Sequence, residues 1–455
     1  MAAMKHKNIQ AESSPRVKDV AGLRDLEEAL KRKDVTQIVH ELAWLFPEKA
    51  KNEKLRKLAQ FALDDAEPPL TRDRKERVFL ECIAETKRIL RGGPMRPMSR
   101  LSIGRELDFI SDCEGVEGWT IAQCLSNLLL GQIRPRRKAA VVSSMRNDGI
   151  YILDWIAHYN VIGFEHSIIY TNDNSDGSEE LLRLLADHGV ITLIESEITG
   201  TVPPERKAYG HAVQALHELR DFEWAMFVDS DEYFIPGPQY ECSIANVLSA
   251  VERQFPEKLP SGICYHWLWF ISAMAFARTP GLLIERFQHA RRHRLTKCIA
   301  RVADIASMRR DHYPEVKEGG IVVDSVFDPV DLDSIYSADP RYGGGRVNHY
   351  WTRSFEEFAV KKARGATLNL AENQYDRPLS TFFAWNGFET PENHFPPDTA
   401  LLRNVKRRIE ELKALEGVRE ASTKLERNFP EFVRNLAGEN LRNLYEESRT
   451  EVTDL

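Results

Sequence analysis

The segment of the sequence with the clearest chemical meaning is an apolar run that ends in carboxylates, Phe227-Val228-Asp229-Ser230-Asp231-Glu232. A buried strand rarely ends in this way, because burying a carboxylate is unfavourable unless another group compensates its charge. Asp229 and Asp231 alternate, so at the end of a strand both would project to the same side. Two carboxylates at this spacing suit Mn²⁺ or Mg²⁺, with a diphosphate completing the coordination shell. The alternative is an acidic turn that binds no ligand, which is how we interpret Asp331-Leu332-Asp333 in its polar loop.

The composition limits the class of protein. The chain has 455 residues, of which 42% are hydrophobic and 29% charged, as in an ordinary globular protein of two or three domains. The net charge is 62 − 69 = −7, so a general affinity for nucleic acid is not indicated. No apolar run approaches the ~20 residues that span a bilayer, and the polar start lacks a signal-peptide pattern. We therefore expect no transmembrane segment, while peripheral contact with a membrane stays open.

The cysteines carry no recognisable pattern. They are scattered without a Cys-x-x-Cys pair, at Cys82, Cys113, Cys124, Cys242, Cys264 and Cys298. This spacing indicates neither a zinc site nor a disulfide framework. Reduced cysteines predict a cytoplasmic protein, which leaves room for a position at the inner face of the membrane.

Four regions are expected along the chain. Residues 1–20 are polar and we expect them to be mobile. Residues 21–137 have apolar residues at helical spacing, which predicts an all-helical accessory domain. Residues 138–395 form the main domain, and residues 396–455 are charged helices with a polar tail. The charge through Lys138 is 27 − 21 = +6, so the rest carries −7 − 6 = −13, which indicates either a surface for an anionic partner or a solvated bundle.

The region after Lys138 predicts an α/β fold with a mostly parallel sheet flanked by helices. The expected strands are Ala139–Ser144, His166–Asn172, Val190–Glu195 and Trp224–Val228. The expected helices are Ile150–Ile162, a segment from the capping box Asp176-Gly177-Ser178-Glu179 to His188, and Glu205–Leu219. In such sheets ligands bind at the carboxyl ends of the strands. The polar residues at these ends are Asn147, Asn172, Asp173, Asp176, Asp229 and Asp231.

Five blocks of the sequence, taken in order, resemble a known group of enzymes. They are Met145–Asp148 with Leu153–Tyr159, Tyr170–Gly177, Phe227–Phe234, Glu285–Phe287, and Asn348–Phe358 with Lys361 and Arg364-Gly365. Together they resemble bacterial family-2-like and family-92-like glycosyltransferases over about residues 138–364. The resemblance implies a GT-A fold, a nucleotide-sugar donor, a divalent metal ion and inversion at the anomeric carbon. Asp148 stands where Glu is usual, and Phe270-Ile271-Ser272 where Phe-Gly-Ser is usual, so the acceptor side departs from the pattern.

The metal and the diphosphate are assigned to five residues. Asp229, Asp231 and His349 would hold Mn²⁺ or Mg²⁺, which stabilises the charge that grows on the departing nucleoside diphosphate. Lys361 and Arg364 lie one turn apart on an expected helix, from which they would bind the diphosphate, although a solvated basic face explains either residue alone.

The nucleoside and the general base are less closely defined. The nucleoside of a nucleotide sugar, with UDP as the expected carrier, would lie over Asn147, Asn172, Asp173 and Asp176, although Asp176 fits a helix cap equally well. Inverting transfer also needs a general base near the acceptor hydroxyl. The sequence does not choose among Glu285, Asp304, Asp311, Glu315, Glu318 and Asp324, of which Glu285, Asp311 and Asp324 are the leading candidates.

The acceptor side leaves several alternatives open. Trp267, Trp269 and Phe270 would either stack on sugar rings or pack in the core. The basic run Arg286–Arg301 would meet an acidic glycan, a phosphorylated acceptor or only solvent. We expect a glycan or polysaccharide acceptor, including an anionic one, and we expect the helices of residues 21–137 to recognise the acceptor or a partner without taking part in the chemistry.

Two other functions compete with a metal-dependent glycosyltransferase. A metal-dependent phosphohydrolase also gathers carboxylates at strand ends, but it would ordinarily show further Asp/His clusters, which we do not find in the sheet region. A non-catalytic glycan- or nucleotide-binding module of the same fold is the second alternative. The intact Asp229, Asp231, His349, Lys361 and Arg364 argue against it.

Overall fold

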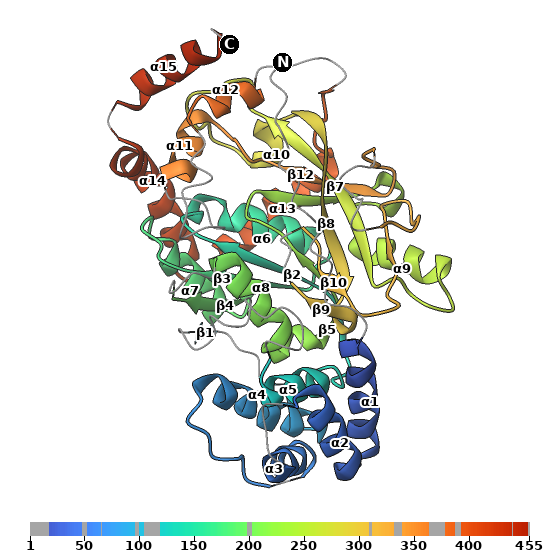
Figure 1. Ribbon diagram of the computed structural model, residues 1–455. Helices are drawn as coiled ribbons and strands as arrows, with labels where there is room; N and C mark the ends of the chain where they lie inside the picture. Colours follow the sequence, from blue (N-terminus) through green and yellow to red (C-terminus); the bar gives the residue numbers. More distant parts are fainter. Residues whose placement is uncertain are drawn as a thin grey trace. The chain divides into compact units, whose positions relative to one another are not determined.

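The computed structural model describes most of the chain (Figure 1). The described residues are 18–47, 52–64, 66–95, 100–103, 119–197, 203–308, 312–331, 339–363, 378–386, 393–438 and 440–453. The chain divides into two compact units. One comprises Met1–Gly93 with Asp112–Gln132, and the other comprises Pro94–Ser111 with Ile133–Leu455.

The first unit is helical where it is described. Its helices are α1 (Lys18–Arg32), α2 (Val35–Leu45), α3 (Asn52–Leu63), α4 (Arg74–Leu90) and α5 (Ile121–Leu130). Their starts follow from capping: Asp34 accepts a hydrogen bond from the Gln37 amide, and Thr120 and Gln123 form a capping box at α5. Each helix buries an apolar stripe, as with Leu42 on α2 and Ile83 on α4.

The second unit is built on one large mixed sheet. Its strands are β1 (Arg100–Ile103), β2 (Arg137–Met145), β3 (His166–Thr171), β4 (Ile191–Ser196), β5 (Phe222–Phe227), β6 (Glu232–Pro236), β7 (Gly262–Ile271), β8 (His289–Arg301), β11 (Val322–Val323) and β12 (Gly345–His349). The order across the sheet is β1-β4-β3-β2-β5-β8-β7-β12-β6, with β11 paired to β7 off this path. A separate two-stranded sheet joins β9 (Ile305–Ser307) and β10 (Glu315–Val316).

The strands are parallel as far as β5 and mixed in direction beyond it. Strands β1, β4, β3, β2 and β5 run parallel, whereas β8 runs antiparallel to both β5 and β7. Strand β12 is parallel to β7 and antiparallel to β6. Consequently the carboxyl ends of β2, β3, β5, β7 and β12 all reach the same edge of the sheet. The fold class is the predicted one: a mostly parallel α/β sheet with helices.

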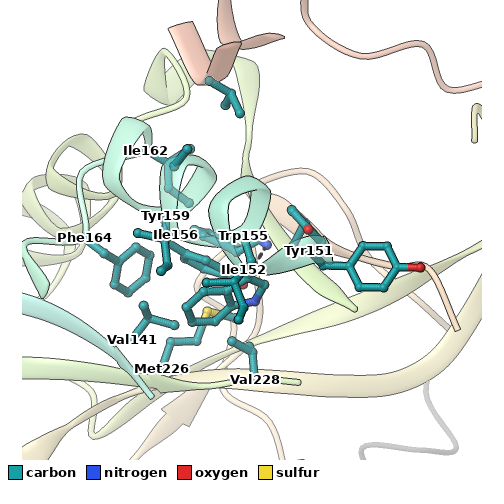
Figure 2. Packing of buried hydrophobic residues seen from close by; sticks show 14 of the residues in the cluster. Val141, Tyr151, Ile152, Trp155, Ile156, Tyr159, Ile162, Phe164, Met226 and Val228 are labelled. Atoms are coloured by element: carbon teal, nitrogen blue, oxygen red, sulfur yellow. Dashed lines mark hydrogen bonds between the residues drawn. The ribbon is translucent and has the colours of Figure 1, made fainter. Parts of the chain in front are cut away.

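The helices of this unit cover the sheet and extend to the carboxyl end of the chain (Figure 1). They are α6 (Ile152–Val161), α7 (Ser178–Asp187), α8 (Pro204–Gln214), α9 (Ile244–Gln254), α10 (Leu283–Arg286), α11 (Phe355–Ala363), α12 (Thr381–Asn386), α13 (Thr399–Lys413), α14 (Val418–Ala437) and α15 (Leu441–Thr453). Figure 2 shows Ile152 and Trp155 of α6 packing against Val141, Met226 and Val228 of the sheet. The same core includes residues of α13 and α14.

The sequence located the first strands correctly, and the structure differs from it in three places. Residues 21–137 are not all helical, because Arg100–Ile103 forms β1 and pairs in parallel with β4 at the edge of the sheet. The helix predicted for Glu205–Leu219 ends at Gln214 and is followed by a 3₁₀ turn, His217–Asp221. Residues 396–455 do not stand apart, since Val405 and Leu425 lie in the core of the sheet unit.

One pair of cysteines also departs from expectation. Cys264 of β7 and Cys298 of β8 lie directly opposite each other in the antiparallel register and form a disulfide. The sequence had indicated no disulfide framework, and this pair departs from that expectation, while the cytoplasmic location stays a prediction. No helix in the described part of the chain is both long enough and apolar enough to cross a membrane.

Candidate functional site

The turn between β5 and β6 carries the carboxylates singled out in the sequence. The amide of Val228 donates to Val142 O (3.0 Å) and so extends the β5–β2 ladder by one residue. The Glu232 amide donates to Asp229 O (3.1 Å), and the Trp155 indole nitrogen donates to the same oxygen (3.2 Å). Contacts with β2 and with α6 therefore hold the turn in place without a ligand.

Asp231 lies at the centre of a buried ion-pair network. Strand β12 pairs antiparallel with β6, and the Tyr350 amide donates to Asp231 O (2.8 Å). This pairing places His349 Nε2 3.6 Å from Asp231 Oδ1, while Lys361 of α11 donates to Asp231 Oδ2. Burial alone would raise the pKa of Asp231, but Lys361 and His349 outweigh it and hold the pKa well below its ordinary value. Asp231 is thus a carboxylate at neutral pH.

Asp229 has a different environment. Its side chain is 37% exposed, and Lys297 of β8 lies 3.4 Å from Asp229 Oδ1. Lys297 is itself buried and contacts Glu232 at 3.2 Å. Burial, and then the neighbouring Asp229, raise the pKa of Glu232 well above its ordinary value despite Lys297. Of the three acidic side chains of this turn, Asp229, Asp231 and Glu232, Asp229 is the one that faces solvent.

The donor types at this turn fit a divalent cation. Asp229 and Asp231 offer carboxylate oxygens, and burial lowers the pKa of His349, which favours the neutral imidazole that binds metal. Within the described residues, however, no three His, Cys, Asp or Glu side chains are arranged to hold a metal ion. A cation here would take its remaining ligands from a diphosphate and would share Asp231 with the ammonium of Lys361. The assignment of Asp229, Asp231 and His349 to a metal stays a prediction.

The loops after β2 and β3 meet, as their predicted position at neighbouring strand ends requires. Asn147 Oδ1 accepts a hydrogen bond from the Ser175 amide (2.7 Å), and the Asn147 amide donates to Asn174 Oδ1 (2.8 Å). Asp176 accepts from the amides of Gly149 (2.8 Å) and Ser178 (2.9 Å). Asn147 and Asp176 therefore hold these loops together, which is the structural alternative that the sequence left open for Asp176.

Two residues of these loops remain available to a ligand. Asp173 is exposed and adopts a left-handed backbone conformation with φ 39°. Asn172 is buried, and its Nδ2 has no hydrogen-bond partner among the described residues. A buried amide without a partner is unfavourable. Nucleoside binding by Asn147, Asn172, Asp173 and Asp176 stays a prediction, with Asn172 and Asp173 as its best-placed members.

Arg353 joins these loops to the region of His349. Its guanidinium lies 3.6 Å from Asp148 Oδ1 and 3.7 Å from the centroid of the Tyr151 ring. The residue is buried with a left-handed backbone, φ 52°, and nearby Tyr151, Asp148 and Asp231 raise its pKa although burial opposes this. Sequence reasoning placed Arg353 in a block of the resemblance but gave it no role. Asp148 stands where the resembled glycosyltransferases usually have Glu. It lies in the loop after β2 and contacts this guanidinium.

The described candidates for a general base have structural partners elsewhere. Glu285 contacts Lys406 of α13 and caps α10 by accepting from the Leu282 amide (3.2 Å). Asp324 accepts from the Val326 and Asp328 amides (2.9 and 3.1 Å) and pairs with Arg341. Asp304 accepts from Ser261 Oγ, Glu315 accepts from Ser307 Oγ, and Glu318 is exposed. Asp311 and Arg364 lie outside the described residues.

A group of aromatic and histidine side chains lies beside His349, and sequence reasoning had identified only part of it. We call it the tryptophan cluster, and it consists of Trp267, Trp269, Trp351, Trp385, His293, His312 and His349. Trp267 and Trp269 are nearly fully buried, so core packing, one of the two alternatives, describes them in this structure. Trp385 and the histidines at positions 293 and 312 had no signal in the sequence, because strands and loops far apart in the chain bring them together.

Residues 143–335 of the chain match the family model described as "Glycosyltransferase family 92". The matched segment is less than half of the chain. It includes the carboxylate turn and most of the tryptophan-bearing strands, but His349 and Lys361 lie beyond it. Over this segment the chain is similar to glycosyltransferases.

Curated relatives include two plant proteins of that family. A glycosyltransferase family 92 protein of Oryza sativa subsp. japonica is 32% identical over 110 residues, which is 23% of this chain and 18% of that protein. One of Ricinus communis is 30% identical over 96 residues, 21% of this chain and 16% of that protein. This chain thus aligns with less than a fifth of either relative, and the bacterial part of the resemblance stays a prediction.

Among solved structures, a crystal structure of S. aureus TarS is similar in outline. It has 12% sequence identity and a TM-score of 0.23, and the match covers 70% of this chain and 88% of that chain. A second TarS structure gives a TM-score of 0.24 over 65% of this chain and 55% of that one. These scores are too low to support an argument about function.

Proposed function

We propose that this protein is a glycosyltransferase that moves a sugar from a nucleotide-sugar donor to a glycan or polysaccharide acceptor. The observation that carries the proposal is the convergence on Asp231 of His349 and Lys361, which lie more than a hundred residues further along the chain. A buried carboxylate held ionised at a strand end by the Lys361 ammonium and the neighbouring His349 imidazole is suited to a polyanionic ligand with its own counter-ions. The match to family 92 supports the same class of reaction.

The chemistry of transfer assigns tasks to these side chains. As the sugar leaves, negative charge grows on the nucleoside diphosphate, and groups aimed at that charge lower the barrier. Lys361 reaches the turn from α11 with a side chain that is 25% exposed, so its ammonium can serve both Asp231 and a phosphate. A bound Mn²⁺ or Mg²⁺, held by Asp229, Asp231 and His349, would supply further neutralisation. Metal dependence, inversion and a UDP carrier are parts of the proposal.

The test begins with nucleotides and metal. The full chain is heated with nucleoside diphosphates, in the presence of Mn²⁺ or of a chelator. Metal-dependent stabilisation by one diphosphate supports the proposal, because a ligand that binds only the folded state raises the unfolding temperature. Nucleotide sugars are then screened for metal-dependent release of nucleoside diphosphate. Absence of both effects with every common nucleotide sugar would overturn the proposal.

The competing functions give different results in the same assay. A phosphohydrolase would release inorganic phosphate from phosphomonoesters or nucleotides without a requirement for sugar. A binding module would be stabilised by nucleotide or glycan but would turn over neither. Neither alternative has a specific supporting contact among the described residues.

The role of the helical unit and the location of the protein are further parts of the proposal. The helices of residues 21–137 would recognise the acceptor or a partner, in line with the net charge of +6 through Lys138, and would leave donor turnover unchanged. A cytoplasmic location requires that Cys264 and Cys298 be reduced in cells. Alkylation of thiols during lysis, followed by mass analysis, reports the redox state of this pair directly.

A further inference from the structure

The tryptophan cluster is organised around strands β7 and β12. Trp269 and His349 are register neighbours on these two strands, so they lie on the same face of the sheet. The ring of Trp269 lies 5.5 Å from His349, 5.2 Å from Trp351 and 4.6 Å from Trp385, between ring centroids. The indoles of Trp269 and Trp385 are nearly parallel, with 5° between their planes. Trp351, Trp385, His293 and His312 are half-buried, so Trp351 and Trp385 are the tryptophans of the cluster that reach the surface.

The interior of this cluster contains polar atoms without partners. Trp267 Nε1, Trp269 Nε1 and His349 Nδ1 are buried and make no hydrogen bond to any described residue. These side chains are only 5%, 6% and 4% exposed. Buried polar atoms are nearly always paired in folded proteins, because an unpaired one loses its water without compensation. Ordered water or a ligand is what ordinarily completes such groups, so the cluster is a candidate for binding a hydroxyl-bearing ligand.

The helix that carries Trp385 is firmly anchored. The neighbouring Asn386 accepts hydrogen bonds at its Oδ1 from the amide of Ser272 (2.7 Å) and from Thr352 Oγ1 (3.2 Å). Phe382 and Phe383, on the same helix, are buried in a separate aromatic core with Phe355 and Tyr445. The indole of Trp385 is therefore held in place against Trp269 by the backbone of α12.

The cluster lies beside the carboxylate turn, on the side away from the donor loops. His349 links it to Asp231, and the Lys361 ammonium that binds Asp231 lies 5.6 Å from the centroid of the Trp351 ring. Across the sheet, β2 and β3 precede β5, whereas β7 and β12 follow it. A donor over the loops after β2 and β3 would therefore have the cluster on the opposite side of the turn, where the second substrate must enter.

We propose that Trp351 and Trp385 form the acceptor-binding surface, on which a pyranose ring of the acceptor glycan lies with its C–H face against the indoles. This inference rests on the proposed function and deepens it. One face of a pyranose is apolar whereas its rim carries hydroxyls, so flat aromatic rings beside unpaired polar atoms match it in both respects. Rigid, partly exposed tryptophans bind with little loss of side-chain entropy. Trp385 is the specificity-determining residue that the sequence did not reveal.

The test compares substitutions of Trp385 in the full chain. The probe is an array of neutral and uronic-acid-containing oligosaccharides of defined structure, on which binding of the labelled protein is measured. Trp385→Ala is expected to weaken binding of the glycans that the parent protein recognises by about tenfold, which corresponds to the loss of one aromatic contact. Trp385→Phe keeps an aromatic face and should restore most of the binding. In transfer assays, KM for the acceptor should rise more than KM for the nucleotide sugar.

The control is Trp44→Ala, at a tryptophan that is 50% exposed in the helical unit. It should bind glycans as the parent does, and thermal unfolding of every variant checks that the fold is retained. Equal glycan binding by Trp385→Ala and the parent overturns the inference, as does a parent protein that binds no glycan. Loss of nucleotide binding with glycan binding retained would show that the indoles stack on a nucleobase instead. If no nucleotide sugar is consumed but Trp385→Ala still loses glycan binding, the proposed transfer fails and the glycan surface stands.

Discussion

The two sides of the carboxylate turn satisfy their polar groups in different ways. On the donor side, Asn147 and Asp176 are hydrogen-bonded to main-chain amides of the facing loop, so these loops have their shape without a ligand, although the buried Asn172 Nδ2 has no partner among the described residues. On the other side, Trp269 Nε1 and His349 Nδ1 have no partner among the described residues. A loop that is already hydrogen-bonded loses little conformational entropy when it binds a ligand. Unpaired buried groups, by contrast, form their hydrogen bonds only when a ligand or water is present. The first arrangement favours tight binding of one ligand, and the second favours selectivity for hydroxyl-bearing groups.

The largest effect is expected at the turn that separates the two sides. Asp231→Asn removes the charge that Lys361 and His349 compensate, and it should lower turnover of the nucleotide sugar by about 10²–10³-fold, as is typical when one electrostatic group is lost. The measurement is release of nucleoside diphosphate at saturating metal. The matched control is Asp331→Asn, at an exposed side chain in a segment whose sequence has the same spacing of carboxylates. Similar losses in the two variants would remove the carboxylate turn from the proposed site.

The disulfide crosslinks only the side that bears the tryptophan cluster. Cys264 and Cys298 are separated by 34 residues, and closing a loop of that length restricts the unfolded chain by about 4 kcal/mol in the loop-entropy model. The double substitution to Ser should therefore lower the free energy of unfolding by about 2–4 kcal/mol. Urea denaturation with and without a reductant provides the measurement. Nucleotide affinity should stay within about twofold of the parent at low temperature, and a larger loss would show that the two sides are coupled.

Acidification should destabilise the sheet unit through the buried His158 of α6, whose Nε2 lies 2.8 Å from Phe234 O of β6. Burial lowers the pKa of His158 to about 4, below the value of about 6.5 in an unfolded chain. Between these values the unfolded chain binds a proton that the folded chain does not, so stability is lost as pH falls from about 6.5 toward 4, by about 1.4 kcal/mol per pH unit. His158→Gln should reduce that slope in denaturation curves. His40→Gln, at a side chain that is 73% exposed, should leave the slope unchanged.

The smallest effects should separate two neighbouring aspartates of the donor loops. Asp176→Ala removes two hydrogen bonds to main-chain amides and should lower the free energy of unfolding by about 1–2 kcal/mol. Asp173→Ala removes an exposed carboxylate and should leave stability nearly unchanged, while weakening nucleotide binding by up to about tenfold. Calorimetry and thermal unfolding of both variants distinguish these outcomes. If both variants bind nucleotide as the parent does, the donor does not lie over these loops.

The sequence predicted best what depends on local signals. Strands β2 to β5 were located because each is a short apolar run bounded by a cap or a glycine, and the carboxylates at their ends followed from the same pattern. Strand β8 was identified only as a basic run. About half of its residues are not fully buried, and its many charged residues obscure the alternation of apolar and polar positions. That His349 meets Asp231 came from the resemblance alone. Antiparallel pairing of β6 with β12 joins distant segments, and no periodicity in either segment signals it.

The position of Trp385 lay beyond both kinds of reasoning. Its neighbour Asn386 is anchored by Ser272 and Thr352, and these residues belong to segments that are contiguous only in the folded protein. For the general base, the sequence suggested residues that the structure does not support. Glu285 and Asp324 were chosen for charge and position in the chain, but the structure gives both carboxylates partners of their own. The chemical role of a residue cannot be assigned from its type until the groups that it contacts in the fold are known.

Strand β1 has a consequence for the order in which the chain folds during synthesis. It lies between the two segments of the helical unit, so Pro94–Ser111 leaves that unit before α5 has been made. In the described sheet β1 pairs with β4 alone. Strand β4 emerges from the ribosome only after β2 and β3. The helices can therefore assemble around α5 before β1 has a strand to pair with. The first strand to be synthesised therefore cannot pair in the sheet until β2, β3 and β4 have been made.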